Sequence, residues 1–109
     1  MPDDPRTSEL GRFAEPALLV LVSLAGGPKH GYAIMTDVES FGATSIGPGT
    51  LYAVLARLER RGLIEPLGPQ DRRRPYRLTM DGAAALEVQL REMGRFVRAA
   101  QARQPGAAT

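Results

Sequence analysis

A run of three arginines, Arg72-Arg73-Arg74, lies between two short strand candidates. Seven of the chain's arginines fall within residues 57 to 77, where they outnumber three acidic residues and give a local net charge of +4. The rest of the 109-residue chain carries a net charge of −2. Guanidinium groups gathered on one stretch of an otherwise slightly acidic chain are suited to binding a polyanion. The alternative is a solvated, arginine-rich loop.

A second polar feature opens the segment from Gly47 to Gly62. Gly47 is suited to cap a helix, Pro48 to begin it and Gly62 to end it. The apolar residues of this helix fall on one stripe: Leu51, Val54, Leu55 and Leu58. Thr50 and Tyr52 lie in its first turn, where Thr50 could contact a base or a phosphate and Tyr52 a phosphate. The alternatives are capping by Thr50 and core packing by Tyr52.

The sequence lacks the residue sets that catalysis and metal binding need. It has no cysteine and only one histidine, His30, so thiolate sites and multi-histidine sites are excluded. Asp37 and Glu39 are two residues apart and do not share a helix face. Gly47-Pro48-Gly49 lacks the lysine of a phosphate-binding loop. We therefore expect no enzyme, no metal and no cofactor, and we expect His30 to help start a helix.

Hydrophobic patterns place three helices before the basic stretch. An almost wholly apolar helix from Pro16 to Leu24 should be the central buried element. A second helix is predicted over about Gly31 to Ser40, with Asp37 and Glu39 facing outward. The third is the segment that begins after Gly47.

The basic run is predicted to lie at the tip of a β-hairpin. Its strands are Leu63 to Leu67 and Pro75 to Thr79. Prolines in both strands cannot donate to a central ladder, so we expect an isolated edge hairpin. Arg77 either extends the basic surface or pairs with Glu65 across the hairpin.

The last helix is predicted to begin after Thr79, a good N-cap residue. Its apolar residues recur at spacings of 4, 3, 4 and 3, with Phe96 beside them: Leu86, Leu90, Met93, Val97 and Ala100. They could pack on their own domain. Because a chain of this size has little core left for a helix of ~20 residues, we favour a homodimer seam.

This order of elements predicts a mainly α protein with a small β-hairpin, namely a winged helix-turn-helix with a long C-terminal dimerisation helix. The expected divisions are a flexible segment (1–12), the DNA-binding domain (13–80), the dimerisation helix (81–103) and a flexible tail (104–109). The most apolar run, Ala17 to Ala25, has nine residues, and a membrane span needs ~20. We expect a cytoplasmic protein without membrane contact.

In a winged helix-turn-helix the third helix enters the major groove and its N-terminal residues face the base edges. The predicted DNA-contacting residues are Lys29, Tyr32, Thr50, Tyr52, Arg57, Arg72, Arg73, Arg74 and Arg77. Tyr32 is expected to pack against the third helix, with a hydroxyl that could reach the DNA backbone. Arg57 lies at mid-helix, where a solvated face is the alternative.

Four segments, in this order and at this spacing, carry a family resemblance: Leu24 to Tyr32, Gly49 to Tyr52, Leu55 to Ile64, and Tyr76 to Gly82. With them the sequence closely resembles the PadR-like family of transcriptional regulators from residue 16 to about residue 90. The resemblance implies a homodimeric DNA-binding repressor whose dimer is made by the long C-terminal helix with the first helix. A single C-terminal helix looks like the short subfamily.

The resemblance also implies partners. They are double-stranded DNA, a second copy of the chain and, as for many family members, a small aromatic or amphipathic effector. We expect any effector near Phe96, Met93 and the first helix. The sequence departs from the family at Gly47 and Ala53, where Ser and Pro are usual. It also lacks tryptophan, so an effector held between tryptophans is not expected.

These features predict a sequence-specific transcriptional regulator. We expect a repressor that binds a palindromic operator as a homodimer and is released by an effector. The alternative is a winged-helix protein–protein interaction module without specific DNA binding. That module would be expected to lose the basic hairpin tip and the polar helix start, which this sequence retains.

Overall fold

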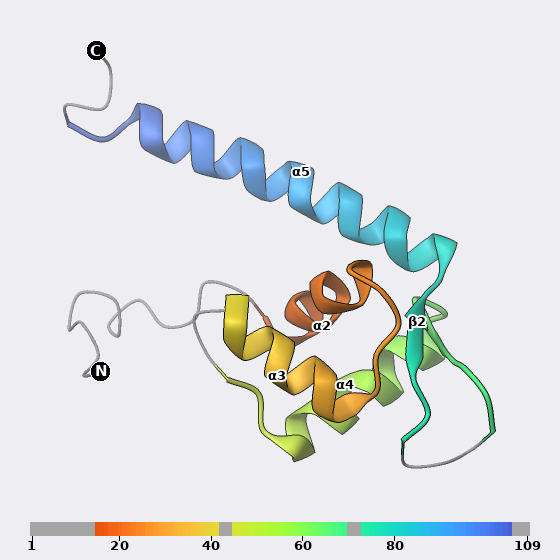
Figure 1. The fold of residues 1–109 in the computed structure, drawn as a ribbon. Coiled ribbons are helices and arrows are strands. Elements are labelled where there is room, and N and C mark those ends of the chain that lie inside the picture. Colours follow the sequence, from red (N-terminus) through yellow and green to blue (C-terminus); the bar gives the residue numbers. More distant parts are fainter. Residues whose placement is uncertain (1–14, 42–44, 70–72, 106–109) are drawn as a thin grey trace.

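The computed structural model describes residues 15–41, 45–69 and 73–105, and Figure 1 shows its elements. In chain order they are α2 (Pro16–Ala25), α3 (Gly31–Phe41), α4 (Pro48–Arg60), β1 (Ile64–Pro66), β2 (Tyr76–Leu78) and α5 (Met80–Ala102). This mainly helical arrangement with an antiparallel hairpin confirms the predicted fold class. The predicted flexible segment at 1–12 and Arg72 lie outside the described residues.

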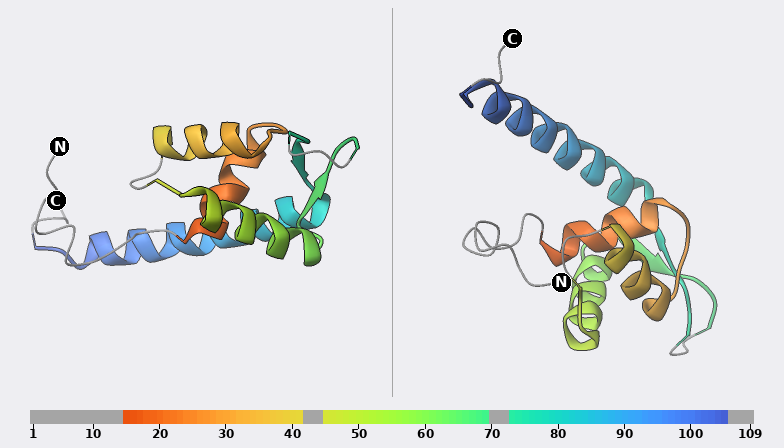
Figure 2. Two further views of the ribbon diagram at one scale, coloured as in Figure 1. Left: turned by 90° about the horizontal axis from the view of Figure 1, so that it is seen from below. Right: turned by 60° about the vertical axis from the view of Figure 1, so that its left-hand side comes forward.

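Helix α2 is the central element of the fold. It contacts α3, α4, α5 and β2, so its surroundings are protein on several sides (Figures 1 and 2). Leu19, Val20 and Leu24 are buried on it. A helix with protein on several sides exposes little of its surface to solvent, which explains why its sequence is apolar nearly all round.

The ends of α4 agree with the sequence prediction. Gly47 is the N-cap, Pro48 is the first helical residue, and the predicted apolar stripe is buried. Gly62 has a φ of +74°, the left-handed conformation that favours glycine after a helix. The amides of Gly62 and Leu63 then donate to the carbonyls of Glu59 and Leu58, which satisfies the last turn of the helix.

Strands β1 and β2 pair with Ile64 opposite Leu78 and Glu65 opposite Arg77. The two strands form a two-stranded sheet of their own, as predicted, and one further contact joins this sheet to the helices. Lys29, between α2 and α3, forms a bridge with Tyr76: the Lys29 amide donates to the Tyr76 carbonyl (3.2 Å) and the Tyr76 amide to the Lys29 carbonyl (2.9 Å). This extra pairing ties the hairpin to the helices.

Helix α5 begins at a junction with the end of α4. Thr79 is its N-cap, as predicted: its hydroxyl accepts from the Gly82 amide (3.0 Å) and donates to the Gly62 carbonyl (2.7 Å). Only Gly82 and Leu86 are buried on α5, and both lie in its N-terminal part. The C-terminal half extends beyond the shorter helices (Figures 1 and 2). Within the described ranges, no helix combines the length and apolar character needed to cross a membrane.

Candidate nucleic-acid interface

The N-terminal half of α4 presents an exposed face. Gly49 and Thr50 are exposed, whereas Leu51 beside them is fully buried. Ala53 and Ala56 continue the exposed side toward the middle of the helix. Because these residues have small side chains, a ligand could approach the backbone of α4 closely.

Tyr52 lies at the contact between α4 and the start of α3. It is 48% exposed, and its hydroxyl lies close to Gly31. A Cβ added to Gly31 would lie 2.6 Å from the Tyr52 Oη, so a side chain there would displace the tyrosine. Tyr52 therefore packs its hydroxyl end against the start of α3, while about half of the residue stays exposed. Tyr32 is 71% exposed, so the prediction that it packs against α4 was wrong.

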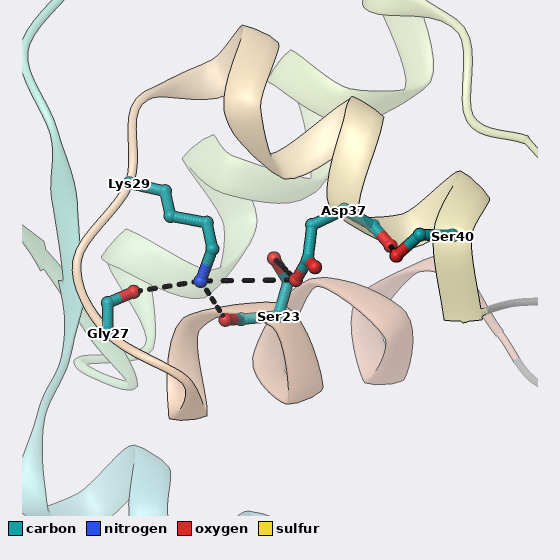
Figure 3. A network of polar contacts seen from close by, with 5 residues as sticks. All are labelled: Ser23, Gly27, Lys29, Asp37 and Ser40. Atoms are coloured by element: carbon teal, nitrogen blue, oxygen red, sulfur yellow. Dashed lines mark hydrogen bonds and ion pairs between the residues drawn. The ribbon is translucent and has the colours of Figure 1, made fainter.

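Lys29 is engaged inside the fold, as Figure 3 shows. Its ammonium donates to the carbonyl oxygens of Ser23 (2.5 Å) and Gly27 (3.2 Å), at the end of α2. Asp37 lies 3.9 Å from the same ammonium. The lysine thus supplies the charge that the C-terminus of α2 favours and links α2 to α3.

Asp37 was expected to face outward, and this was wrong. Its carboxylate accepts from the hydroxyl of Ser23, which is buried on α2, at 2.7 Å (Figure 3). A buried hydroxyl needs a partner, and the carboxylate on the neighbouring helix supplies it. A prediction from helical periodicity that places every charged residue on the solvent side misses such a pair.

An ion pair joins the two strands of the hairpin. The Arg77 Nε donates to the Glu65 carboxylate at 2.9 Å, across the register that places these residues opposite each other. Both side chains are about half exposed. Of the two roles left open for Arg77, the structure contains the pairing with Glu65.

Two arginines near the hairpin tip differ in their surroundings. Arg74 is mostly buried: its guanidinium lies 5.5 Å from the centre of the Tyr76 ring and 3.8 Å from the Glu59 carboxylate on α4. Arg73 is exposed in the turn beside it. Arg74 therefore connects the hairpin to α4, whereas Arg73 is accessible from solvent.

Arg57 lies on a different flank of α4. Together with Arg61 it lines a groove that α4 forms with α2 and α5. Both arginines are exposed. The groove has a volume of about 380 Å³. Two residues of α5 were expected near an effector, and of these Met93 lines the groove and Phe96 does not.

The apolar stripe of α5 divides into two parts. Leu86 is 6% exposed and belongs to the core of its own chain. Leu90, Val97 and Phe96 are exposed, with Phe96 at 73%. Met93 and Ala100 are partly buried. The first stripe residue thus anchors α5 to its own domain, and the later ones form an accessible apolar surface.

Residues 20–88 match the Transcriptional regulator PadR-like family. This chain belongs to that family. The match covers more than half of the chain and includes α4, the hairpin and the start of α5. Its family consists of transcriptional regulators rather than enzymes.

A solved structure agrees with the family assignment. The fold is similar to the crystal structure of a PadR family transcription regulator from Clostridium difficile R20291, with a TM-score of 0.69 and 26% identity. The similarity covers 80% of this chain and 94% of that one. The short PadR form with a single C-terminal helix fits the structure.

Two curated relatives are longer proteins. An uncharacterized 37.1 kDa protein in transposon TN4556 of Streptomyces fradiae is 44% identical over 85 residues, which cover 78% of this chain and 25% of that protein. The transcriptional activator GvpE2 of Halobacterium salinarum is 32% identical over 78 residues, 72% of this chain and 39% of that protein. This chain thus corresponds to less than half of either relative.

Proposed function

We propose that this PadR-family regulator is a homodimeric repressor that binds a palindromic operator and leaves it when a small effector binds. The supporting observation is the exposed first turn of α4 together with an exposed arginine of the hairpin. Thr50 is accessible there, and Arg73 is accessible at the hairpin tip. A helix start of this kind can enter a major groove, while a cationic hairpin contacts the neighbouring phosphates.

The proposed DNA contacts are of two kinds. Thr50 and the small exposed residues Ala53 and Ala56 can approach base edges, where Thr donates or accepts and an Ala methyl contacts a thymine methyl. Tyr52, Arg72 and Arg73 would contact the phosphate backbone. Three further basic residues already form hydrogen bonds or ion pairs within the chain: Lys29, Arg74 and Arg77. Their proposed contribution is to the shape and the positive electrostatic potential of the DNA-facing surface.

The symmetry of the proposed dimer determines the arrangement of the half-sites in the operator. A two-fold axis relating two copies would present two α4 helices to the same side of the duplex. The half-sites would then be inverted repeats centred about one helical turn, or ~34 Å, apart. The accessible apolar residues of α5 supply the surface for this proposed contact.

Fluorescence anisotropy with a duplex from the protein's own upstream region tests the proposal. We expect binding about a thousandfold tighter than to a scrambled duplex. Arg73→Ala should reduce the slope of log K against log salt by about one, because one phosphate contact is lost. Arg95→Ala, an exposed arginine on α5, is the control and should leave the slope unchanged.

Equal, weak binding to both duplexes, with no sequence enriched from a random duplex pool, would favour the protein–protein module instead. The sign of regulation needs a separate readout. A reporter placed behind the bound duplex should be expressed less when the protein is present, and increased expression would contradict repression.

The Glu59–Arg74 contact gives a second prediction. Arg74→Ala removes an ion pair and a contact with the Tyr76 ring, and we expect the hairpin to be held less firmly against α4. DNA affinity should fall about fivefold, a cost near 1 kcal/mol. The salt slope should stay the same, because the guanidinium positions the hairpin and contacts no phosphate.

Glu59→Gln separates this role from a direct DNA contact. If Arg74 positions the hairpin, Glu59→Gln also lowers affinity. If Arg74 instead contacts a phosphate, removing its competing carboxylate raises affinity, and Arg74→Ala flattens the salt slope. Glu87→Gln is the matched control, because Glu87 pairs with Arg91 (3.6 Å) within α5.

A further inference from the structure

The turn between α2 and α3 is formed by residues that constrain it weakly: Gly26, Gly27 and Pro28. The amides of the two glycines donate to carbonyls in the last turn of α2. Gly27 then has a φ of +135°, which favours glycine, and Pro28 has no amide hydrogen to donate. Backbone hydrogen bonds therefore end before the turn is complete, and a further contact is needed to keep it in one conformation.

The side chain of Lys29 supplies this contact. It folds back over the turn, and its ammonium donates to the carbonyls of Ser23 (2.5 Å) and Gly27 (3.2 Å), as Figure 3 shows. One carbonyl belongs to the last part of α2 and the other to the turn, so the ammonium joins the two. The lysine side chain is only 21% exposed, which leaves its charge largely withdrawn from solvent.

Asp37 holds the same ammonium from the side of α3. Its Oδ2 lies 3.9 Å from the Lys29 Nζ and accepts from the buried Ser23 hydroxyl at 2.7 Å (Figure 3). One carboxylate therefore contacts the lysine and α2 together. The position of the ammonium is set by α2, by the turn and by α3, and α2 and α3 both pack against α4.

The backbone of Lys29 is the part of the turn that meets the hairpin. Its amide and carbonyl exchange hydrogen bonds with Tyr76, at 3.2 and 2.9 Å. Within the hairpin, Tyr76 lies opposite Pro66, which has no amide hydrogen to donate. The main-chain groups of Tyr76 are bonded to Lys29 instead, which satisfies them. The residue whose side chain fixes the turn thus also places β2.

We propose that Lys29 is a positioning residue for DNA binding. Its side chain fixes the α2–α3 turn, and through the backbone bridge to Tyr76 the turn fixes the hairpin relative to α4. The consequence for DNA binding rests on the proposed function. A hairpin that is already in place loses little conformational freedom when the duplex binds, so the complex is tighter. The lysine itself contacts no phosphate.

Lys29→Met tests this role, because it keeps a long side chain and removes the ammonium. We expect operator affinity, measured by anisotropy, to fall about tenfold. The slope of log K against log salt should stay the same, because no phosphate contact is lost. Lys29→Arg can donate to the same carbonyls and should recover most of the affinity. Arg103→Met is the matched control, because Arg103 donates to the Ala99 carbonyl (2.9 Å) at the end of α5.

Hydrogen exchange of single amides, measured by NMR on the full chain without DNA, tests the positioning itself. In Lys29→Met the Tyr76 amide should exchange at least about tenfold faster. The Leu63 amide, which donates to the Leu58 carbonyl at the end of α4, is the reference and should be unchanged. A general loss of stability would accelerate both amides, whereas a released hairpin accelerates Tyr76 alone. Circular dichroism confirms that each variant is folded.

Asp37→Asn separates positioning from a direct phosphate contact. The amide oxygen can still accept from the Ser23 hydroxyl, but the charge beside the lysine is lost. Positioning predicts an affinity lower by about twofold. A higher affinity would mean that the carboxylate competes with DNA for the lysine, and it would overturn the proposal.

Three results with Lys29→Met would also overturn it: unchanged operator affinity, a salt slope smaller by about one, or equal acceleration of the two amides. The exchange experiment separates this inference from the proposed function. Faster exchange at Tyr76 alone, in a protein whose unmodified chain binds no operator, would support the positioning and reject the proposed function. Operator binding that Lys29→Met leaves intact would reject the positioning and support the proposed function.

Discussion

Replacing Gly82 by alanine is expected to lower the free energy of unfolding by about 3 kcal/mol, near the upper end of the usual cost of overpacking. An added Cβ would lie 1.9 Å from the carbonyl oxygen of Leu63 and 2.9 Å from its carbonyl carbon. Both atoms belong to the backbone, so the clash cannot be relieved by a rotamer change. Urea denaturation followed by circular dichroism, at fixed protein concentration, measures the loss.

The cost is high because the Leu63 backbone is held from both sides. Its amide donates to the Leu58 carbonyl and its carbonyl accepts from the Thr79 amide. Moving Leu63 away from Gly82 would break the end of α4 or the cap of α5. The substitution should therefore also weaken DNA binding, because this junction sets the position of the hairpin relative to α4.

Gly94→Ala is the matched control on the same helix. A Cβ there would lie 3.3 Å from the Arg98 Nη1, the end of a flexible side chain that can move. Alanine is the better helix former by about 1 kcal/mol, so we expect unchanged or slightly increased stability. Equal destabilisation by both substitutions would show that the Gly82–Leu63 contact is not the cause.

The fold was predictable because local signals agreed. Gly47-Pro48, Gly62 and Thr79 each fix an element end by a short-range rule, and the structure confirms all three. The apolar stripe of α4 could be identified from the spacing of its residues alone. Such features depend on residues within a few positions of each other, so one sequence is enough to identify them.

The missed features depend on contacts between distant residues. Ser23 and Asp37 are 14 positions apart, and no periodicity signals that the hydroxyl on one helix needs the carboxylate on the next. The bridge from Lys29 to Tyr76 likewise requires the packed helices to bring two distant segments together. The close approach of Gly82 to Leu63 is also invisible in the sequence, where Gly82 stands as an unexplained glycine in a helix.

The candidate site shows the same division. The sequence placed a polar start on α4 and positive charge on the hairpin, and both are exposed in part. It could not separate Arg73 from Arg74. Their difference comes from Glu59 and Tyr76, which approach Arg74 only in the folded chain. Charge counting identifies a basic region, but the folded structure determines how far each of its cations is exposed.

Val97→Asp is expected to convert the proposed dimer to a monomer and to weaken operator binding by about a hundredfold or more. A charge at this position would have to be buried against the second copy, and losing that copy removes the gain from binding two half-sites at once. Sedimentation velocity measures the mass, and anisotropy measures the affinity. Removing α5 altogether is a poorer test, because Leu86 belongs to the core and its loss would disturb the fold.

Val88→Asp distinguishes the seam from a general effect of charge on α5. Val88 and Val97 are each 46% exposed on the same helix. Nine residues separate them, which at ~100° per residue places them on opposite sides. The same substitution at Val88 should therefore leave the dimer and its DNA affinity intact. If Val97→Asp remains a dimer, or if Val88→Asp alone dissociates it, the copies meet through the opposite face of α5. The spacing of the two α4 helices, and so of the half-sites, would then have to be assigned again from that contact.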